Sequence, residues 1–492
     1  MGRQRRGTDG QAAPGIRTAS AAGARVPPSP GPGRSPDGPQ WRALQTGLDG
    51  ELVLPGDAGY EAGRLPRNLL YAEQAHPEAI AYCTGPDDVA QCVRFTRRYG
   101  LRLAVRGGGH CYGAWSSRAP LVVDLSRMTG VRIDGEGHAE IRAGTPLITV
   151  YEELARHGVT VPAGSCPTVG LAGLALGGGH GVVSRSYGLT CDSLAGAEVV
   201  LPDGRTVYCD EQTEPDLLWA LRGAGNGNFG VVTSLRMRTH PATDLTEFRA
   251  SWPYRDAGTA LEHWQDWAFD APDNLWSHFL LEAPRDSPTA DVGGFLLGGG
   301  GEDEANRWLD GLLAVTGPAS ARQVTHRSYL ATVRSNAGGE TVLARLDEQR
   351  FAFTAASQFF DRRLGPQAIR DTLAVLRRVP DGVSAAISFN VLGGAVNRVP
   401  ADATAFVHRN SRLLAQYYAS WPAGGPAEAA VRWVGQVREA LRPYTSGHAY
   451  QNYRDPELTD WRQAYYGANL PRLERLRVHY DPDRLLDFPQ AL

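Results

Sequence analysis

A glycine-rich stretch decides the fold: residues 164–181 read Gly-Ser-Cys-Pro-Thr-Val-Gly-Leu-Ala-Gly-Leu-Ala-Leu-Gly-Gly-Gly-His-Gly. Glycine at this density weakens the interior of a helix or strand, and it is typical of backbone that lies close against a flat or phosphorylated ligand. Cys166, near the start, is either part of that ligand site or a small buried side chain. The stretch therefore predicts a ligand-facing loop.

A second glycine loop comes earlier, where residues 106–112 read Arg-Gly-Gly-Gly-His-Cys-Tyr and follow a strand-like run at 101–106. Three consecutive glycines let backbone N–H groups converge on an anion without interference from Cβ atoms. His110 then lies at the rim of whatever the loop binds. The alternative is a tight turn that carries a surface histidine.

A third loop, residues 223–230, contains a formal Gly-x-Gly-x-x-Gly pattern from Gly225 to Gly230. In a Rossmann domain this pattern follows a strand and opens a helix. Here residues 231–240 are rich in β-branched side chains and predict a strand instead. We therefore expect no Rossmann domain and interpret these glycines as another ligand-facing turn.

Aromatic side chains crowd the tail, where residues 450–455 read Tyr-Gln-Asn-Tyr-Arg-Asp and Trp461, Tyr465 and Tyr466 follow. Such crowding is typical of a core or an interface. The alternative is a tail that returns to line a cleft of the first domain.

Composition excludes several classes of function. The 492 residues include 50 basic and 53 acidic ones, for a net charge of −3, and no lysine. Without lysine, Schiff-base chemistry and P-loop phosphate binding are excluded. The chain has no broad basic field for nucleic acid. The histidines show no zinc-like spacing and no Cys-x-x-Cys occurs, so no metal site is expected.

Two further patterns bear on the cellular setting. No run of 18 apolar residues occurs, so no membrane span is predicted. The first residues lack the apolar core of a signal peptide, which predicts a cytoplasmic protein.

Strand-like and helical segments alternate through the first half of the chain, and this predicts an α+β or α/β fold. Composition changes near residue 238, which we interpret as a domain boundary. The predicted units are a disordered Gly/Pro/Arg-rich extension at 1–45, a first domain at 50–237, a second at 238–440 and a C-terminal segment at 441–492.

In combination, these motifs resemble those of the berberine-bridge-enzyme-like FAD-linked oxidases, which belong to the vanillyl-alcohol-oxidase superfamily with a PCMH-type FAD-binding domain. The resemblance covers about residues 50–492. The matching segments are Arg106 to His110, Cys166 to Gly181, Gly227 to Thr233, Tyr450 to Asp455, Tyr465 to Gly467 and Tyr480 to Pro482.

The resemblance implies an α+β fold with a two-lobed FAD domain, a substrate domain whose antiparallel sheet is covered by helices, and a tail that returns to the FAD domain. It implies FAD held by two covalent bonds, from His110 to the flavin 8α-methyl carbon and from the Cys166 sulfur to C6. At Val169, three positions after the cysteine, valine goes with access of O2 and leucine blocks it. The other cofactor-binding residues it implies are Arg106, Gly107, Gly108, Gly109, Gly170, Gly173, Gly177, Gly178, Gly179, Gly181, Gly227, Asn228, Val232, Asn452 and Tyr453.

For catalysis the resemblance implies hydride transfer from a small-molecule substrate to flavin N5, with O2 as the final acceptor and H2O2 as a product. Plant members hold a catalytic glutamate shortly after a Gly-Gly pair in the substrate domain. Arg398 takes that place here, and arginine cannot act as a base. We therefore predict that Tyr450 is the main proton acceptor, assisted by Tyr453 and Tyr112.

Two substrate classes stay open. One is an alcohol, hemiacetal or similar C–H group of a natural-product-like molecule, and the other is the anomeric hydroxyl of a carbohydrate, which gives a lactone. We predict substrate contacts for Asn390, Leu392 and Arg398. Either class could stack on tryptophan, and the candidates are Trp252, Trp264, Trp267 and Trp276.

A non-catalytic flavin-binding protein is a third possibility, which the presence of both covalent anchors disfavours. For the enzyme we expect a monomer or a homodimer.

Overall fold

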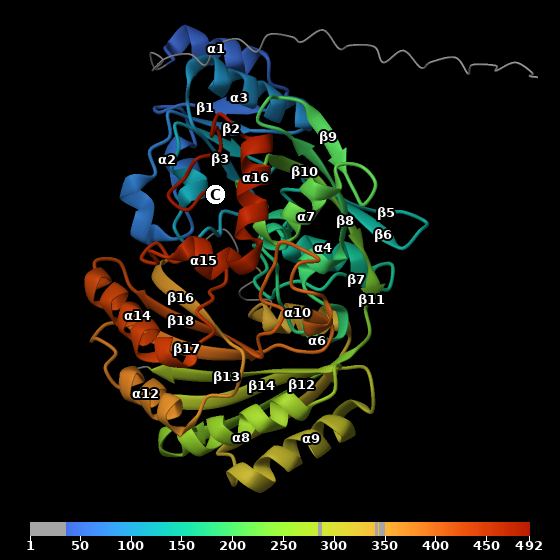
Figure 1. Cartoon of the computed structure of the whole chain (residues 1–492), viewed down its shortest axis with the longest axis vertical. Coiled ribbons are helices and arrows are strands. Elements are labelled where there is room, and N and C mark those ends of the chain that lie inside the picture. The colour runs from blue at the N-terminus through green and yellow to red at the C-terminus, as the bar shows by residue number, and fades with distance from the viewer. Residues whose placement is uncertain (1–35, 284–287, 340–342, 344–349) are drawn as a thin grey trace, which may run out of the picture.

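The computed structural model describes residues 36–283, 288–339, 343 and 350–492 (Figure 1). Its described part combines helices with three larger sheets and a two-stranded one, which confirms the predicted mixture of helix and sheet. Among these residues, no helix is both long enough and apolar enough to cross a membrane.

The first sheet has the order β1-β2-β4-β3, and its last three strands are parallel. Helix α3 connects β2 to β3 and begins at Pro86, with acidic residues in its first turn. It ends at Tyr99, and the next residue, Gly100, caps it with a φ of +63°, which glycine tolerates. Its buried face follows the 3.6-residue period, with Val89, Cys92 and Val93 inside. The elements are β1 (Glu51–Val53), β2 (Ala79–Tyr82), α3 (Pro86–Tyr99), β3 (Leu103–Arg106) and β4 (Leu121–Asp124).

Helix α1 (Gly38–Thr46) corrects the predicted domain boundary. The Asp37 side chain caps it, and its buried Trp41 packs on Phe95 of α3. These contacts place residues 38–45, predicted as part of a disordered extension, in the fold of the first domain. Burial of Trp41 and Leu44 is the physical reason. The rest of the extension, residues 1–35, lies outside the described residues.

The second sheet is antiparallel, in the order β5-β6-β10-β8-β9. Strand β10 follows the third glycine loop directly, as expected, so the Gly-x-Gly-x-x-Gly pattern does not open a helix. The strands are β5 (Val131–Ile133), β6 (His138–Arg142), β8 (Leu194–Val200), β9 (Thr206–Cys209) and β10 (Val231–Arg238), with helices α4 (Leu147–Ala155), α5 (Leu171–Leu176), α6 (Ser184–Tyr187) and α7 (Pro215–Ala224) between them.

The largest sheet lies in the second half of the chain and is antiparallel, in the order β15-β12-β14-β13-β17-β18-β16. Four helices cover the face that points away from the other two sheets (Figure 1). The strands are β12 (Leu245–Pro253), β13 (Leu275–Ala283), β14 (Thr289–Leu297), β15 (Ala321–Arg327), β16 (Ala352–Phe360), β17 (Ser384–Val391) and β18 (Leu413–Trp421), and the helices are α8 (Ala257–Asp270), α9 (Gly301–Thr316), α12 (Pro366–Leu376) and α14 (Ala427–Leu441).

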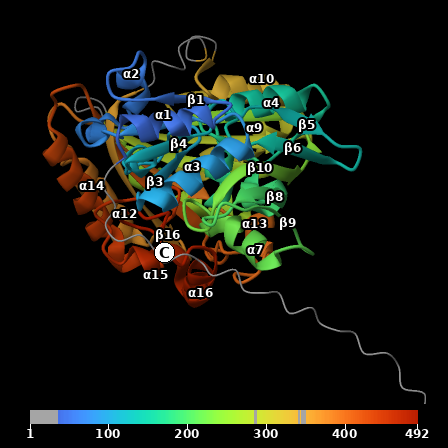
Figure 2. The same cartoon turned by 90° about the horizontal axis from the view of Figure 1, so that it is seen from above.

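The tail returns to the first domain. Helix α15 (Trp461–Tyr466) precedes α16 (Leu470–Tyr480), which lies beside α7 in both views (Figures 1 and 2). The Arg472 guanidinium lies 3.9 Å from the centre of the Trp219 ring, and the backbone N–H of Leu492 donates to Asn228 Oδ1 at 3.1 Å.

A buried arginine joins the two domains. Arg185 of α6 donates to the carbonyl oxygens of Leu392, at 2.7 Å, and Ala271, at 2.6 Å. Gly393 and Gly394 have φ of +114° and +55°, and a Cβ on Gly394 would lie 2.3 Å from the Arg185 carbonyl oxygen. The Gly-Gly pair is therefore needed for this close approach.

Candidate active site

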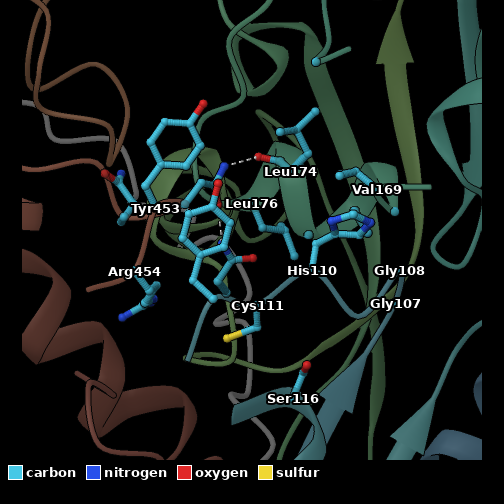
Figure 3. Close-up of a pocket in the computed structure, with 18 of the residues that line it drawn as sticks. Gly107, Gly108, His110, Cys111, Ser116, Val169, Leu174, Leu176, Tyr453 and Arg454 are labelled. Atoms are coloured by element: carbon cyan, nitrogen blue, oxygen red, sulfur yellow. Dashed lines mark hydrogen bonds between the residues drawn. The ribbon is translucent and has the colours of Figure 1, made fainter. Parts of the chain in front are cut away.

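A cavity of about 720 Å³ lies between the first domain and the large sheet. The glycine loops form one part of its wall, the tail forms another, and strands β13, β14, β17 and β18 of the large sheet close it on the other side. Figure 3 shows His110 and Val169 on one side of this cavity and Tyr453 on the other.

The two predicted anchor loops pack backbone against backbone. A Cβ on Gly108 would lie 2.3 Å from the Gly170 nitrogen, and one on Gly170 would lie 2.7 Å from the Gly108 nitrogen. Because real Cβ contacts are not that short, both positions require glycine. The packing brings His110 and Cys166 to the wall of the same cavity.

The side chain of His110 is oriented by the opposite loop: its Nε2 atom lies 2.8 Å from Thr168 Oγ1. Burial and the nearby Arg67 lower the pKa of His110 to about 3, so its imidazole is neutral at neutral pH. Cys166 is exposed to the cavity, and desolvation by the surrounding protein raises the pKa of its thiol, with Arg67 opposing. A neutral imidazole and a thiol facing one cavity fit the two attachment points that a doubly linked flavin requires.

Most residues predicted to bind the cofactor line this cavity. They are Gly107, Gly108, Gly109, His110, Cys166, Val169, Gly170, Gly173, Gly181, Gly227, Val232, Asn452 and Tyr453. Glycine walls of this kind leave room for a flat ring system and a pyrophosphate.

Other predicted residues lie behind the wall. Arg106 is buried and forms an ion pair with Asp124 at 2.5 Å and a hydrogen bond to Ser117, so its guanidinium holds the protein rather than a ligand. Asn228 donates to the Ala224 carbonyl oxygen.

The triple glycine 177–179 also packs against protein. A Cβ on Gly177 would lie 2.0 Å from Asn452 Oδ1, one on Gly178 2.8 Å from Phe406, and one on Gly179 2.2 Å from Thr190 Oγ1. These three glycines are not among the residues that line the cavity, and their close packing positions the wall; their predicted contact with the cofactor stays a prediction.

The three predicted catalytic tyrosines come together. Tyr112 and Tyr453 stack with ring centres 5.5 Å apart, and Tyr450 meets Tyr453 edge-on at 4.9 Å. Burial raises the pKa of all three phenols above their usual value, so each is protonated at neutral pH.

The oxygen of Tyr450 accepts two hydrogen bonds, from the Gly179 backbone N–H at 2.7 Å and from Asn452 Nδ2 at 2.9 Å. The Asn452 side chain is itself fixed, because its Nδ2 donates to the Leu174 carbonyl and its Oδ1 accepts from Asn226. Tyr450 is therefore held rigidly at the cavity wall.

Of the three residues predicted to contact substrate, one lines the cavity and two do not. Asn390 lines the cavity. Leu392 is buried in a small apolar cluster with Phe406, and Arg398 forms an ion pair with Asp273 on the surface. Neither of these two is among the residues that line the cavity, and the ion pair with Asp273 draws Arg398 outward.

The tryptophans proposed to stack on substrate also lie mostly outside the cavity wall. Only Trp276 of the four candidates lines the cavity. Trp252 and Trp264 are core residues, and Trp267 packs against Trp308 of α9. The odd-numbered side chains of β13 pack under the helices, so the even-numbered Trp276 faces the site.

Several lining residues were not predicted from the sequence. The β13 alternation that places Trp276 also presents His278 and Leu280, while Phe295, Ser388 and Gln416 come from neighbouring strands. His180 was visible in the first glycine stretch as the residue after Gly-Gly-Gly. The strand residues could not be predicted to face the cavity, because the sequence does not show which face of the sheet the helices cover.

Comparison with known proteins agrees with this architecture. Residues 77–210 match the family model for an FAD binding domain, and residues 449–492 match the one described as berberine and berberine like. The chain is 32% identical to the FAD-linked oxidoreductase YgaK of Bacillus subtilis, over 91% of this chain and 98% of that protein. It is 30% identical to the chitooligosaccharide oxidase of Gibberella zeae, over 85% and 87%.

Among solved structures, Physcomitrella patens BBE-like 1 superposes with a TM-score of 0.85 at 28% identity, over 92% of this chain and 98% of the other. A chitooligosaccharide oxidase superposes with a TM-score of 0.83 at 26% identity, over 92% and 99%. The family models, the long alignments and the cavity between glycine loops and sheet agree: this chain is an FAD-linked oxidoreductase of the berberine-bridge-enzyme-like family.

Proposed function

We propose that this enzyme is an oxidase that removes two electrons and two protons from a CH–OH or similar group of a small natural-product-like molecule and passes them to O2, which forms H2O2. The observation that carries the proposal is the pair His110 and Cys166, which line one cavity and whose loops are joined through Thr168 and the Gly108–Gly170 contact. FAD bound there supplies the hydride acceptor.

In this proposal FAD is attached through both anchors. The neutral His110 offers a ring nitrogen for a bond to the 8α carbon, and Cys166 offers its sulfur to C6. His110 is oriented by its hydrogen bond to Thr168, and Cys166 lies two residues before Thr168 in the same loop, so both attachment points are positioned before substrate enters. Digestion followed by peptide mass analysis tests the point: peptides with residues 110 and 166 should carry one shared flavin, and unmodified peptides from an active yellow enzyme would contradict it.

The proton of the substrate hydroxyl passes to the tyrosine group. Tyr450, predicted from the sequence as the main acceptor, is kept protonated by burial and its oxygen already accepts two hydrogen bonds, so it can take this proton only as it releases its own. Tyr453 and Tyr112 complete the group. In a single turnover, Tyr450→Phe should slow flavin reduction by about 10²–10⁴-fold if its phenol takes the proton. Reduction within a few-fold of the parent rate would remove Tyr450 from this role.

A carbohydrate substrate is the second candidate, and the lining of the substrate side favours it in one respect. Polar side chains of His278, Ser388 and Asn390 face the cavity beside the indole of Trp276, which is the mixture of hydrogen-bonding groups and a stacking face that a sugar ring uses. Anaerobic bleaching of the flavin by xylobiose or a chitooligosaccharide, compared with coniferyl alcohol, separates the two classes.

A further inference from the structure

His180 is a cavity residue that the proposed function leaves unused. It follows the triple glycine, lines the cavity, and its Nε2 atom lies 2.8 Å from the hydroxyl oxygen of Tyr453. Its ring meets Tyr450 and Tyr453 edge-on, with centroid distances of 5.7 and 5.8 Å. The imidazole is therefore part of the same aromatic group at the cavity wall as Tyr450 and Tyr453.

The other ring nitrogen of His180 is buried, and among the described residues it has no hydrogen-bond partner. Buried polar groups are normally paired, so such an atom calls for an explanation. A proton on Nδ1 leaves the Nε2 lone pair free to accept from the Tyr453 hydroxyl. Burial lowers the pKa of His180 to about 4, which keeps the imidazole neutral at neutral pH and able to accept a proton.

The hydrogen bonds of the three phenols distinguish them. As a neutral phenol, Tyr450 has both lone pairs engaged by Gly179 and Asn452. Tyr112 accepts from Gln416 Nε2 at 2.8 Å. Of the three, Tyr453 is the one whose oxygen lies beside a basic nitrogen, so it can take a proton on one side and release its own on the other.

We propose that His180 is the terminal proton acceptor of the oxidation and that Tyr453 relays the proton to it. The substrate O–H proton moves to Tyr453 Oη as the Tyr453 O–H proton moves to His180 Nε2, and the electron pair of the substrate O–H bond forms the C=O bond. The substrate C–H bond breaks with its electrons, and that hydride leaves to the cofactor. This inference rests on the proposed function.

The groups that face His180 are uncharged, so they neither repel nor trap the positive charge that it carries after it takes the proton. Tyr450 and Tyr453 are the ring neighbours, and no charged side chain contributes to the lowered pKa, which is due to burial alone. Arrival of the hydride brings negative charge to the same cavity, which raises the pKa of His180 when it takes the proton. The proton then returns to water when that charge is removed.

The decisive variant is His180→Gln, because the glutamine amide can still hydrogen-bond to Tyr453 but cannot take a proton. The control is His240→Gln: His240 also has a pKa lowered to about 4 by burial and stacks on Tyr187, but it is not a cavity residue. Flavin reduction is followed anaerobically in a single turnover, with xylobiose, a chitooligosaccharide and coniferyl alcohol as probes.

We expect His180→Gln to slow reduction by about 10²–10⁴-fold, the usual effect of removing a general base, and His240→Gln to leave it within a few-fold. Tyr453→Phe should be as slow as His180→Gln, and the double variant no slower than either. A His180→Gln enzyme within a few-fold of the parent rate would overturn the proposal and leave His180 a packing residue.

A measurement without turnover separates this inference from the proposed function. In holoenzyme labelled with ¹⁵N-histidine, the signal absent from His180→Gln should show a proton on Nδ1, remain neutral down to pH about 4, and shift in Tyr453→Phe. A proton on Nε2, or protonation near pH 6.5, would overturn the relay even if every probe is oxidised. If the parent enzyme oxidises none of the probes, the proposed function fails for those substrates and the histidine signal alone decides this inference.

Discussion

Thr168 and His110 lie 2.8 Å apart, hydroxyl oxygen to ring nitrogen, and so connect two loops that are 58 residues apart in sequence. One loop carries the nitrogen and the other the sulfur that we propose to hold the flavin. The orientation of one anchor therefore depends on the loop of the other.

Replacing Thr168 should uncouple the anchors. Thr168→Val keeps the volume but removes the hydrogen bond, so the His110 ring loses its orientation. We expect a fall in the fraction of flavin bonded to His110, with the Cys166 link retained, measured by peptide mass analysis. Thr206→Val, at an exposed position of β9, is the control. An unchanged yield at His110 in Thr168→Val would show that the hydrogen bond does not matter for attachment.

Each covalent link should be sufficient to retain the flavin. His110→Ala and Cys166→Ala alone should each keep the flavin absorbance with the protein after acid precipitation, because one bond remains. The double variant should lose its flavin on denaturation. Loss of all flavin absorbance from one single variant would show that the residue replaced in it is the only attachment point.

The contact between the glycine loops should limit stability. Gly170→Ala places a methyl group 2.7 Å from the Gly108 nitrogen, and such overpacking costs about 1–3 kcal/mol. Gly311→Ala in α9 meets nothing within 4 Å and should raise the free energy of unfolding by about 0.5–1 kcal/mol. Chemical denaturation measures both. Equal stability of Gly170→Ala and the parent would show that the loops can separate at no cost.

Access of O2 should depend on Val169, which lines the cavity. Val169→Leu adds a methylene group at the wall, so we expect slower reoxidation by air and an unchanged rate of anaerobic flavin reduction. Stopped-flow measurement of each half-reaction distinguishes the two. Equal reoxidation rates in Val169→Leu and the parent would remove Val169 from control of O2.

Acid should destabilise the fold through its buried histidines. Burial lowers the pKa of His278 to about 4 in the folded protein, whereas the pKa of a histidine in the unfolded chain is about 6.5. The unfolded state therefore binds the proton first, so this contribution to stability is complete above about pH 6.5 and is lost as the pH falls toward about 4.

Between pH 7 and 5 the loss amounts to about 2 kcal/mol for one such site. We expect His278→Gln to lose less stability over this interval than the parent, as measured by chemical denaturation at both pH values. His157→Gln, at an exposed position, is the control. A parallel loss in His278→Gln would refute the assignment.

The sequence predicted that His110 and Cys166 belong to one site because local motifs carry them, and both residues line the same cavity. Glycine at 108 and 170 reports a close backbone approach, and a histidine and a cysteine beside such glycines can be recognised without knowing the fold. Arg398 and Trp264 show where that reasoning failed: an ion pair with Asp273 and burial under the sheet decide their positions. Both depend on contacts between segments far apart in the chain, which no local pattern records.

The hydrogen bonds of Arg185 between the two domains have a consequence for how substrate is selected. Its guanidinium is buried and bonded to two carbonyl groups of the substrate domain, and pulling a charged group from such partners is costly. The two domains therefore do not swing apart in each cycle. We therefore expect the cavity between them to keep its shape during turnover, so that substrates are selected by their fit to a preformed site.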